Sequence, residues 1–63
     1  MARFVIKHPD GLYVREWGET VNGVYAITKV ELVPKAKASS YEKRRYTTPA
    51  IEFVGLPCAV EVR

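Results

Sequence analysis

Side chains that could perform acid–base or nucleophilic chemistry are few and scattered in this chain. His8 is the single histidine, and Asp10 follows it after a proline, where an aspartate commonly bonds its own backbone in a turn. A general base needs an orienting partner and a nucleophile within hydrogen-bond reach. Cys58 alternates with valines, as core residues do, and Glu16 and Glu19 have the spacing of solvated carboxylates. We therefore expect no catalytic residues, no metal site, no cofactor and no enzymatic activity.

The densest charge lies in one segment, residues 35–45. It holds five cations against one acid, Glu42, which gives +4 in a chain whose total charge is +3. Such cations can neutralise phosphates while the interleaved Tyr41 and Tyr46 stack on bases, or they can meet an acidic protein surface. A solvated loop that only aids solubility is the third interpretation. The candidate residues for binding nucleic acid or an acidic surface are Lys35, Lys37, Lys43, Arg44 and Arg45.

A second candidate surface follows from the alternation of residues 3–17. One face of this segment carries cationic and aromatic side chains, a composition typical of interface hot spots and of platforms that stack single-stranded nucleic acid. Alternatively, Trp17 packs under the segment 18–23 and completes the core. If the face is open, the partner-binding residues are Arg3, Lys7, Tyr13, Arg15 and Trp17.

The length of the chain limits what these surfaces can be built on. Its 63 residues make a single domain, 1–63, and a chain of this size buries only about 60% of its unfolded surface. A single Cys excludes an intrachain disulfide, so a binding partner is the remaining source of stability. The sequence shows neither a secretion signal nor an apolar run of membrane-spanning length. We expect a cytoplasmic monomer that does not bind membranes.

Hydrophobic patterning predicts most of the secondary structure. Two alternating runs around a Pro-Asp-Gly turn predict a β-hairpin over residues 3–17. Residues 18–23 are predicted as a loop because Asn22-Gly23 is a turn signal. The β-branched run over residues 24–33 predicts a third strand, and the small, basic residues 35–40 predict a mobile loop.

The segment 41–47 fits two structures. Ser39 could begin a helix through a capping box, but few apolar anchors follow, so an extended segment is favoured. Thr48 as N-cap, Pro49 at the first helical position and Gly55 as C-cap then predict a short helix over residues 49–54.

A last alternating strand is predicted over residues 58–63. The predicted order is thus β-β-β-β-α-β, an α+β fold in which a small antiparallel sheet starting with a β-hairpin carries one short helix on one face. The helix side of the sheet is expected to bury Phe4, Ile6, Leu12, Val14, Ile51, Val54, Leu56, Val60 and Val62.

Two parts of the sequence resemble very small phage-encoded proteins. The first is the run Phe4-Val5-Ile6-Lys7 with Pro9-Asp10-Gly11 and Tyr13-Val14, and the second is Arg44-Arg45-Tyr46-Thr47-Thr48 before a Val-rich end. Within that group, the chain is similar to the RNA polymerase-binding transcription regulators of phages that infect Xanthomonas.

This resemblance implies a non-enzymatic regulator that inhibits transcription initiation by host RNA polymerase and suppresses termination. The implied partners are the polymerase β′ subunit and the elongation factor NusA, and the resemblance carries no functional residue over. The alternative is a nucleic-acid-binding module that uses the basic segment 35–45.

Overall fold

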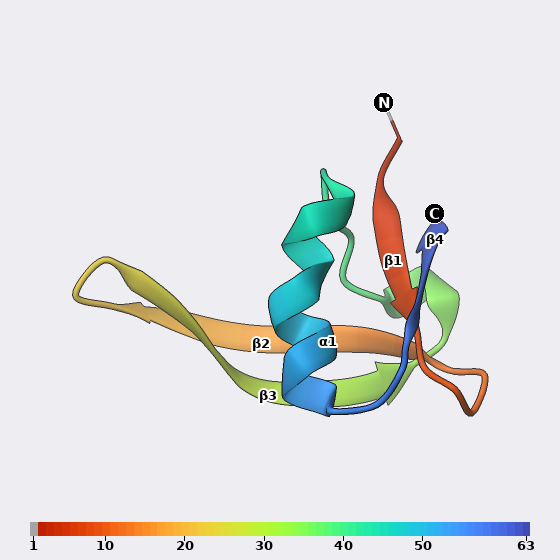
Figure 1. The fold of residues 1–63 in the computed structure, drawn as a ribbon, viewed down its shortest axis with the longest axis horizontal. Coiled ribbons are helices and arrows are strands. Elements are labelled where there is room, and N and C mark those ends of the chain that lie inside the picture. The colour runs from red at the N-terminus through yellow and green to blue at the C-terminus, as the bar shows by residue number, and fades with distance from the viewer. Residues whose placement is uncertain (1) are drawn as a thin grey trace.

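The computed structural model describes residues 2–63 as a four-stranded antiparallel sheet with one short helix (Figure 1). The strands, in the spatial order β3-β2-β1-β4, are β1 (Phe4–Lys7), β2 (Tyr13–Val21), β3 (Val24–Val33) and β4 (Ala59–Val62). The helix α1 (Thr48–Val54) lies between β3 and β4 in the sequence. The predicted α+β class, the antiparallel sheet and the single short helix are confirmed.

The predicted N-terminal hairpin is present. The backbone N–H of His8 donates to the carbonyl of Leu12 over 2.7 Å, and Gly11, at φ +94°, closes the turn. Lys7 then pairs with Tyr13, which is the single register pair between β1 and β2.

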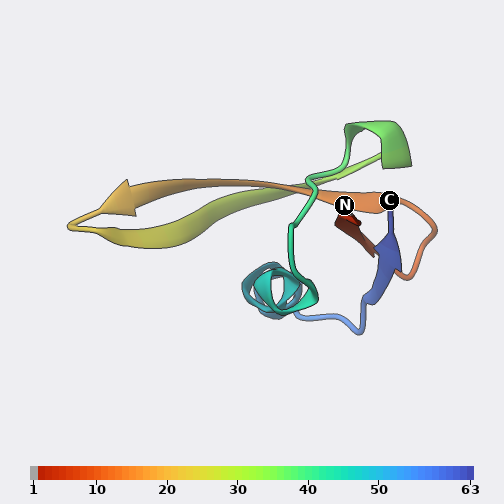
Figure 2. The same cartoon turned by 90° about the horizontal axis from the view of Figure 1, so that it is seen from above.

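The prediction of a loop over residues 18–23 is wrong. β2 continues to Val21 and pairs with the whole of β3, so that only Asn22 and Gly23 form the turn. Both turn residues have positive φ, at 53° and 78°, which is the geometry that matches the twist of a tight hairpin. The outer halves of β2 and β3 therefore form a two-stranded arm, residues 18–27, that projects from the rest of the molecule (Figures 1 and 2).

The predicted mobile loop over residues 35–40 is instead fixed to the sheet. A 3-10 turn, Lys35–Lys37, leads into a segment that lies between β1 and β2 where these strands diverge. The N–H of Ser39 donates to the carbonyl of Val14 on β2, and Tyr41 exchanges two backbone hydrogen bonds of 2.8 Å with Phe4 on β1. Residues 39–41 thus satisfy backbone groups that the two diverging strands cannot offer each other.

The prediction of an extended segment over residues 41–47 is also wrong beyond Tyr41. Residues Arg44–Thr47 form a second 3-10 turn that runs directly into α1, which removes one of the five predicted strands. The hydroxyl of buried Thr47 donates to the carbonyl of Arg44, and Thr48 is the first helical residue, not the N-cap. The helix ends as predicted, at Gly55 in the left-handed conformation.

The helix α1 and the segment that follows β3 lie on opposite sides of the sheet (Figure 2), and each covers a small core. Under α1, Ile6, Val14 and Ala50 are fully buried. On the other side, the segment that follows β3 covers a cluster formed by Val5, Val33 and Ala38. This second segment covers β1. The sheet face that carries Arg3 and Lys7 was expected to be open, and it is not.

Three residues predicted to lie in the helix-side core are exposed. Leu12, Leu56 and Val62 are 41%, 47% and 56% exposed. Leu12 lies in the hairpin turn and Leu56 beyond the helix, while Val62 lies on an edge strand. These three residues lie at the ends of their segments. The helix has only seven residues, and it does not cover those ends of the sheet.

Candidate binding surfaces

The first candidate surface, here called the tryptophan patch, consists of Arg15, Trp17 and Lys29. Trp17 lies on β2 directly opposite Lys29 on β3 and is 36% exposed, so the alternative that it packs under a loop 18–23 is wrong. The guanidinium carbon of Arg15 lies 4.8 Å from the centre of the indole ring, and Nζ of Lys29 lies 5.0 Å from it. Both separations are within the range of cation–π attraction. The patch is thus an exposed aromatic ring with two exposed cations within about 5 Å of its centre.

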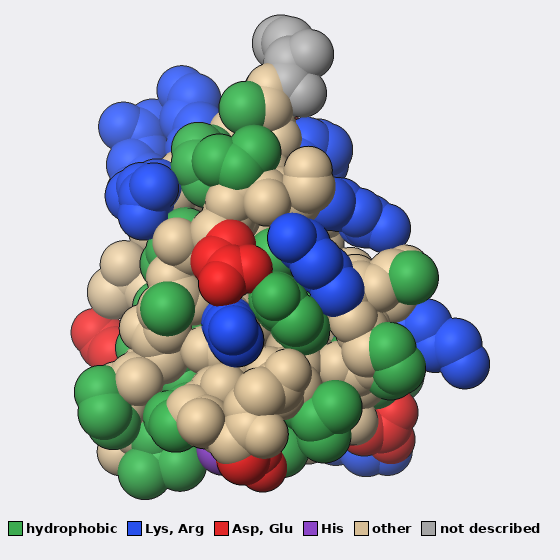
Figure 3. Space-filling view, turned by 90° about the vertical axis from the view of Figure 1, so that its right-hand side faces the viewer, with side chains coloured by type: hydrophobic (Ala, Val, Ile, Leu, Met, Phe, Trp, Pro, Cys, Tyr) green, Lys and Arg blue, Asp and Glu red, His purple; other side chains and the backbone are tan. Residues whose placement is uncertain are grey.

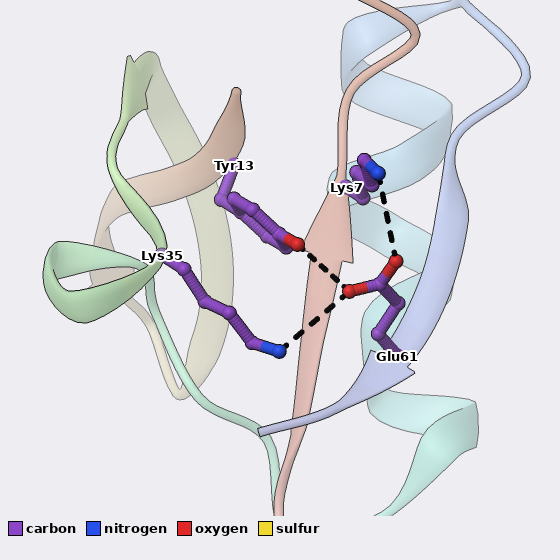
Figure 4. A network of polar contacts seen from close by, with 4 residues as sticks. All are labelled: Lys7, Tyr13, Lys35 and Glu61. Atoms are coloured by element: carbon purple, nitrogen blue, oxygen red, sulfur yellow. Dashed lines mark hydrogen bonds and ion pairs between the residues drawn. The ribbon is translucent and has the colours of Figure 1, made fainter. Parts of the chain in front are cut away.

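Tyr13 and Lys7, which were also predicted for this surface, make contacts within the molecule (Figure 4). The hydroxyl of Tyr13 donates to Oε1 of Glu61 on β4 over 2.8 Å, and this hydrogen bond raises the pKa of the tyrosine. Lys7 and Lys35 approach the same carboxylate, with Nζ at 3.9 Å from Oε2 and 3.7 Å from Oε1 respectively. Lys35 also lies over the ring of Tyr13 at 5.7 Å. Glu61 therefore engages Lys7, Tyr13 and Lys35 within the molecule.

The second candidate surface, here called the basic end, lies around the start of β1 and the end of β4. Arg3 donates from Nε to the hydroxyl of Ser40 over 2.9 Å, and Arg63 donates from Nη2 to the carbonyl of Ala36. A backbone hydrogen bond of 2.8 Å joins Arg63 to Arg3. The six exposed cations of the basic end are Arg3, Lys37, Lys43, Arg44, Arg45 and Arg63.

The remaining members of the basic end come from the second 3-10 turn. Arg44 lies over the ring of Phe4 at 5.2 Å, which places this turn beside β1. Arg45 lies over the ring of its neighbour Tyr46, which is 47% exposed. Figure 3 shows several Lys and Arg side chains at the upper end of the molecule, while others lie lower on that face beside the acidic side chains.

Sequence reasoning therefore found both surfaces in part. It missed Lys29, whose role depends on the register between β2 and β3, and Arg63, which β4 brings beside Arg3. It also grouped Lys35 with the other cations of the segment 35–45, whereas in the structure Lys35 forms an ion pair with Glu61. Neither Lys29 nor Arg63 is marked by a local motif, because the contacts that place them join distant parts of the chain.

A partly buried polar cluster around Glu16 supports the fold on the helix side. Its carboxylate accepts hydrogen bonds from the hydroxyls of Tyr25 and Tyr41, and its backbone N–H donates to the hydroxyl of Ser39. The pKa of Tyr41 is raised, mainly by burial and then by this hydrogen bond, and the hydrogen bond to Glu16 also raises the pKa of Tyr25. Tyr25 crosses over Gly18 to reach the carboxylate, where a side chain would collide with it.

The residues considered for chemistry lie apart. Nδ1 of His8 lies 2.5 Å from Oδ1 of Asp10, a contact within the hairpin turn. Cys58 packs against the helix-side core, and burial raises the pKa of its thiol. Among residues 2–63, no three His, Cys, Asp or Glu side chains lie close enough together to hold a metal ion.

Comparison with known proteins adds no relative: no family model matches the chain, and neither a curated protein nor a solved structure is significantly similar to it. Within residues 2–63, no helix combines the length and the apolar character that crossing a membrane requires. The arguments about function below start from the two surfaces themselves.

Proposed function

We propose that this protein is a non-enzymatic regulator that acts in the cytoplasm by binding another protein through the tryptophan patch. The observation that carries the proposal is the exposed Trp17, with Arg15 and Lys29 beside its ring on a part of the sheet that the cluster of Val5, Val33 and Ala38 does not include. Tryptophan and arginine are the residues most enriched among those whose truncation costs binding energy.

The geometry of the patch favours a protein partner over nucleic acid. A base that stacks on tryptophan needs an open ring face, whereas here two cations already lie within about 5 Å of the ring centre. Arg15, which has no ion pair within residues 2–63, is well placed to meet a carboxylate beside an apolar contact. The partner should therefore present an apolar pocket with acidic groups at its edge.

The first partner to test is bacterial RNA polymerase, because of the resemblance to phage regulators that bind it. On this proposal the protein binds the β′ subunit, inhibits initiation and suppresses termination, with NusA as a second partner. It binds as a monomer, and its effect follows the fraction of polymerase bound.

The test is capture of purified polymerase, with and without nuclease, followed by kinetics of binding. Trp17→Ala should weaken binding by about 2 kcal/mol, roughly 30-fold, and act mainly on dissociation. Arg15→Ala should also weaken binding, and it tests the patch without removing the partly buried ring of Trp17. Thr20→Ala, an exposed change on the opposite face of β2, is the matched control and should leave the affinity unchanged.

Circular dichroism must first show that each variant is folded. If folded Arg15→Ala and Trp17→Ala proteins both bind polymerase as tightly as Thr20→Ala, the tryptophan patch is not the binding surface. If neither the parent protein nor any variant binds polymerase after nuclease treatment, the proposed partner is wrong.

A further inference from the structure

The six cations of the basic end, like Arg15 of the tryptophan patch, differ from the three other lysines of the protein in one respect. Lys7 and Lys35 are paired with Glu61, and Lys29 is paired with Glu31 at 3.7 Å. Within residues 2–63, none of the six cations of the basic end has a carboxylate within 4.0 Å. The contacts of Arg3 and Arg63 go to a hydroxyl and to backbone carbonyls, which leave the guanidinium charge uncompensated.

The fold collects this charge from separate parts of the chain. Arg3 precedes β1, Lys37 lies in the first 3-10 turn, Arg44 and Arg45 lie in the second, and Arg63 follows β4. The segment 35–45 alone includes Lys35, which shares the carboxylate of Glu61 with Lys7, and lacks Arg3 and Arg63. The folded surface therefore concentrates more free charge at one end than the sequence segment indicates.

From this arrangement we infer that the basic end binds the phosphodiester backbone of a nucleic acid. A backbone offers closely spaced negative charges along its length, which is what the six exposed and unpaired cations of the basic end can neutralise. An interface with a protein would need an apolar centre, and the basic end exposes one aromatic side chain, Tyr46, next to its cations.

This site is separate from the tryptophan patch and does not depend on the proposed function. It uses none of Arg15, Trp17 or Lys29, and it predicts binding that tolerates changes of sequence, because phosphate contacts carry no base information. It also predicts strong dependence on salt, since each neutralised phosphate releases bound counterions.

The test is fluorescence anisotropy with labelled single-stranded RNA of roughly 20 nucleotides and with duplex DNA of the same length, each in two unrelated sequences. The variant is Lys37→Gln with Lys43→Gln, because neither side chain makes a hydrogen bond or ion pair among the described residues, so the fold should not change. At about 100 mM salt, each lost phosphate contact should cost roughly fivefold, and the double variant about 25-fold. The slope of log K against log salt should flatten by about 0.7 to 0.9 for each contact.

Lys35→Gln is the matched control, since it removes a cation from the same sequence segment but one that Glu61 already engages. It should change the affinity by less than about threefold.

Tighter binding in the RNA arm than in the duplex arm would identify unpaired strands as the source of the backbone, and the reverse would identify duplex DNA. Binding that is independent of salt, or equal losses in the double variant and in Lys35→Gln, would overturn the inference. So would capture of an acidic protein that depends on Lys37 and Lys43 while both nucleic acids fail to bind.

Discussion

At the scale of single residues, two carboxylates hold the fold together and thereby decide which surface groups remain for binding. Glu61 engages Lys7, Tyr13 and Lys35 on one side of the sheet. Glu16 accepts hydrogen bonds from two tyrosines on the other side. A charged acceptor strengthens each hydrogen bond, and a domain of this size has few apolar contacts to replace them.

Gly18 shows how closely the cluster around Glu16 is packed. A Cβ at this position would come within 2.5 Å of the carbonyl oxygen of Ala26 and would collide with the ring of Tyr25. We predict that Gly18→Ala lowers the free energy of unfolding by about 1–3 kcal/mol, as over-packing commonly does. Urea denaturation checks this. Adding Tyr25→Ala should recover only part of the loss, because the clash with the backbone stays, and a Gly18→Ala protein as stable as the parent would refute the packing.

Tyr41 gives a prediction about pH. Its pKa is raised above its ordinary value of 10.0 in the folded protein, as are those of Tyr13 and Tyr25. Below that value the tyrosine is protonated in both states and its stabilising hydrogen bond is fully present. Above it, the unfolded chain releases the proton while the folded chain keeps it, so the free energy of unfolding falls as pH rises.

Tyr41→Phe should therefore be less stable at neutral pH by about 1–2 kcal/mol and should lose stability less steeply between about pH 9 and 11. Urea denaturation at several pH values measures both. Parallel curves for the variant and the parent protein would show that Tyr41 does not contribute to the alkaline loss. Tyr46→Phe, an exposed change, is the control.

At the scale of elements, the arm formed by the outer halves of β2 and β3 is the part of the sheet with least support. Val14, near the start of β2, is fully buried, whereas Val21 at its end is 55% exposed and Val24 across the turn is 66% exposed. A two-stranded ribbon without a covering layer is only marginally stable. We predict that amide hydrogen exchange is slow at Val14 and becomes progressively faster towards Val21. NMR exchange spectra measure this, and uniform protection along β2 would contradict it.

The arm also shows what the sequence could and could not predict. The β-branched run Val24–Val33 predicted its strand to the residue, and Gly55 predicted the helix end. The pairing of Gly18–Val21 could not be found, because both faces of the arm are exposed and no hydrophobic alternation marks it. The 3-10 turn Arg44–Thr47 was missed for a related reason, since one buried residue, Thr47, anchors it.

At the scale of the whole molecule, the binding surfaces depend on contacts between distant segments. The tryptophan patch needs the register that sets Lys29 opposite Trp17, and the basic end needs β4 beside β1. Individual candidates such as Trp17 and Arg44 could be predicted from residue type alone. Which of them share a surface could not, because composition does not reveal that Glu61 withdraws Lys35 or that Arg63 joins Arg3.

A crossed experiment asks whether the two surfaces act independently. The tryptophan patch and the basic end share no residue, and effects at separate sites normally add to within about 0.5 kcal/mol. We predict that Trp17→Ala weakens the binding of nuclease-treated RNA polymerase about 30-fold while changing RNA affinity by less than about twofold. The variant with Lys37→Gln and Lys43→Gln should do the reverse, losing about 25-fold in RNA affinity and keeping its affinity for the polymerase. Both affinities are measured by anisotropy and by surface plasmon resonance on the same folded preparations. If Trp17→Ala weakens both ligands equally, the two surfaces form one site. If the lysine variant alone loses the polymerase, the protein partner binds at the basic end and the assignment of the surfaces is reversed.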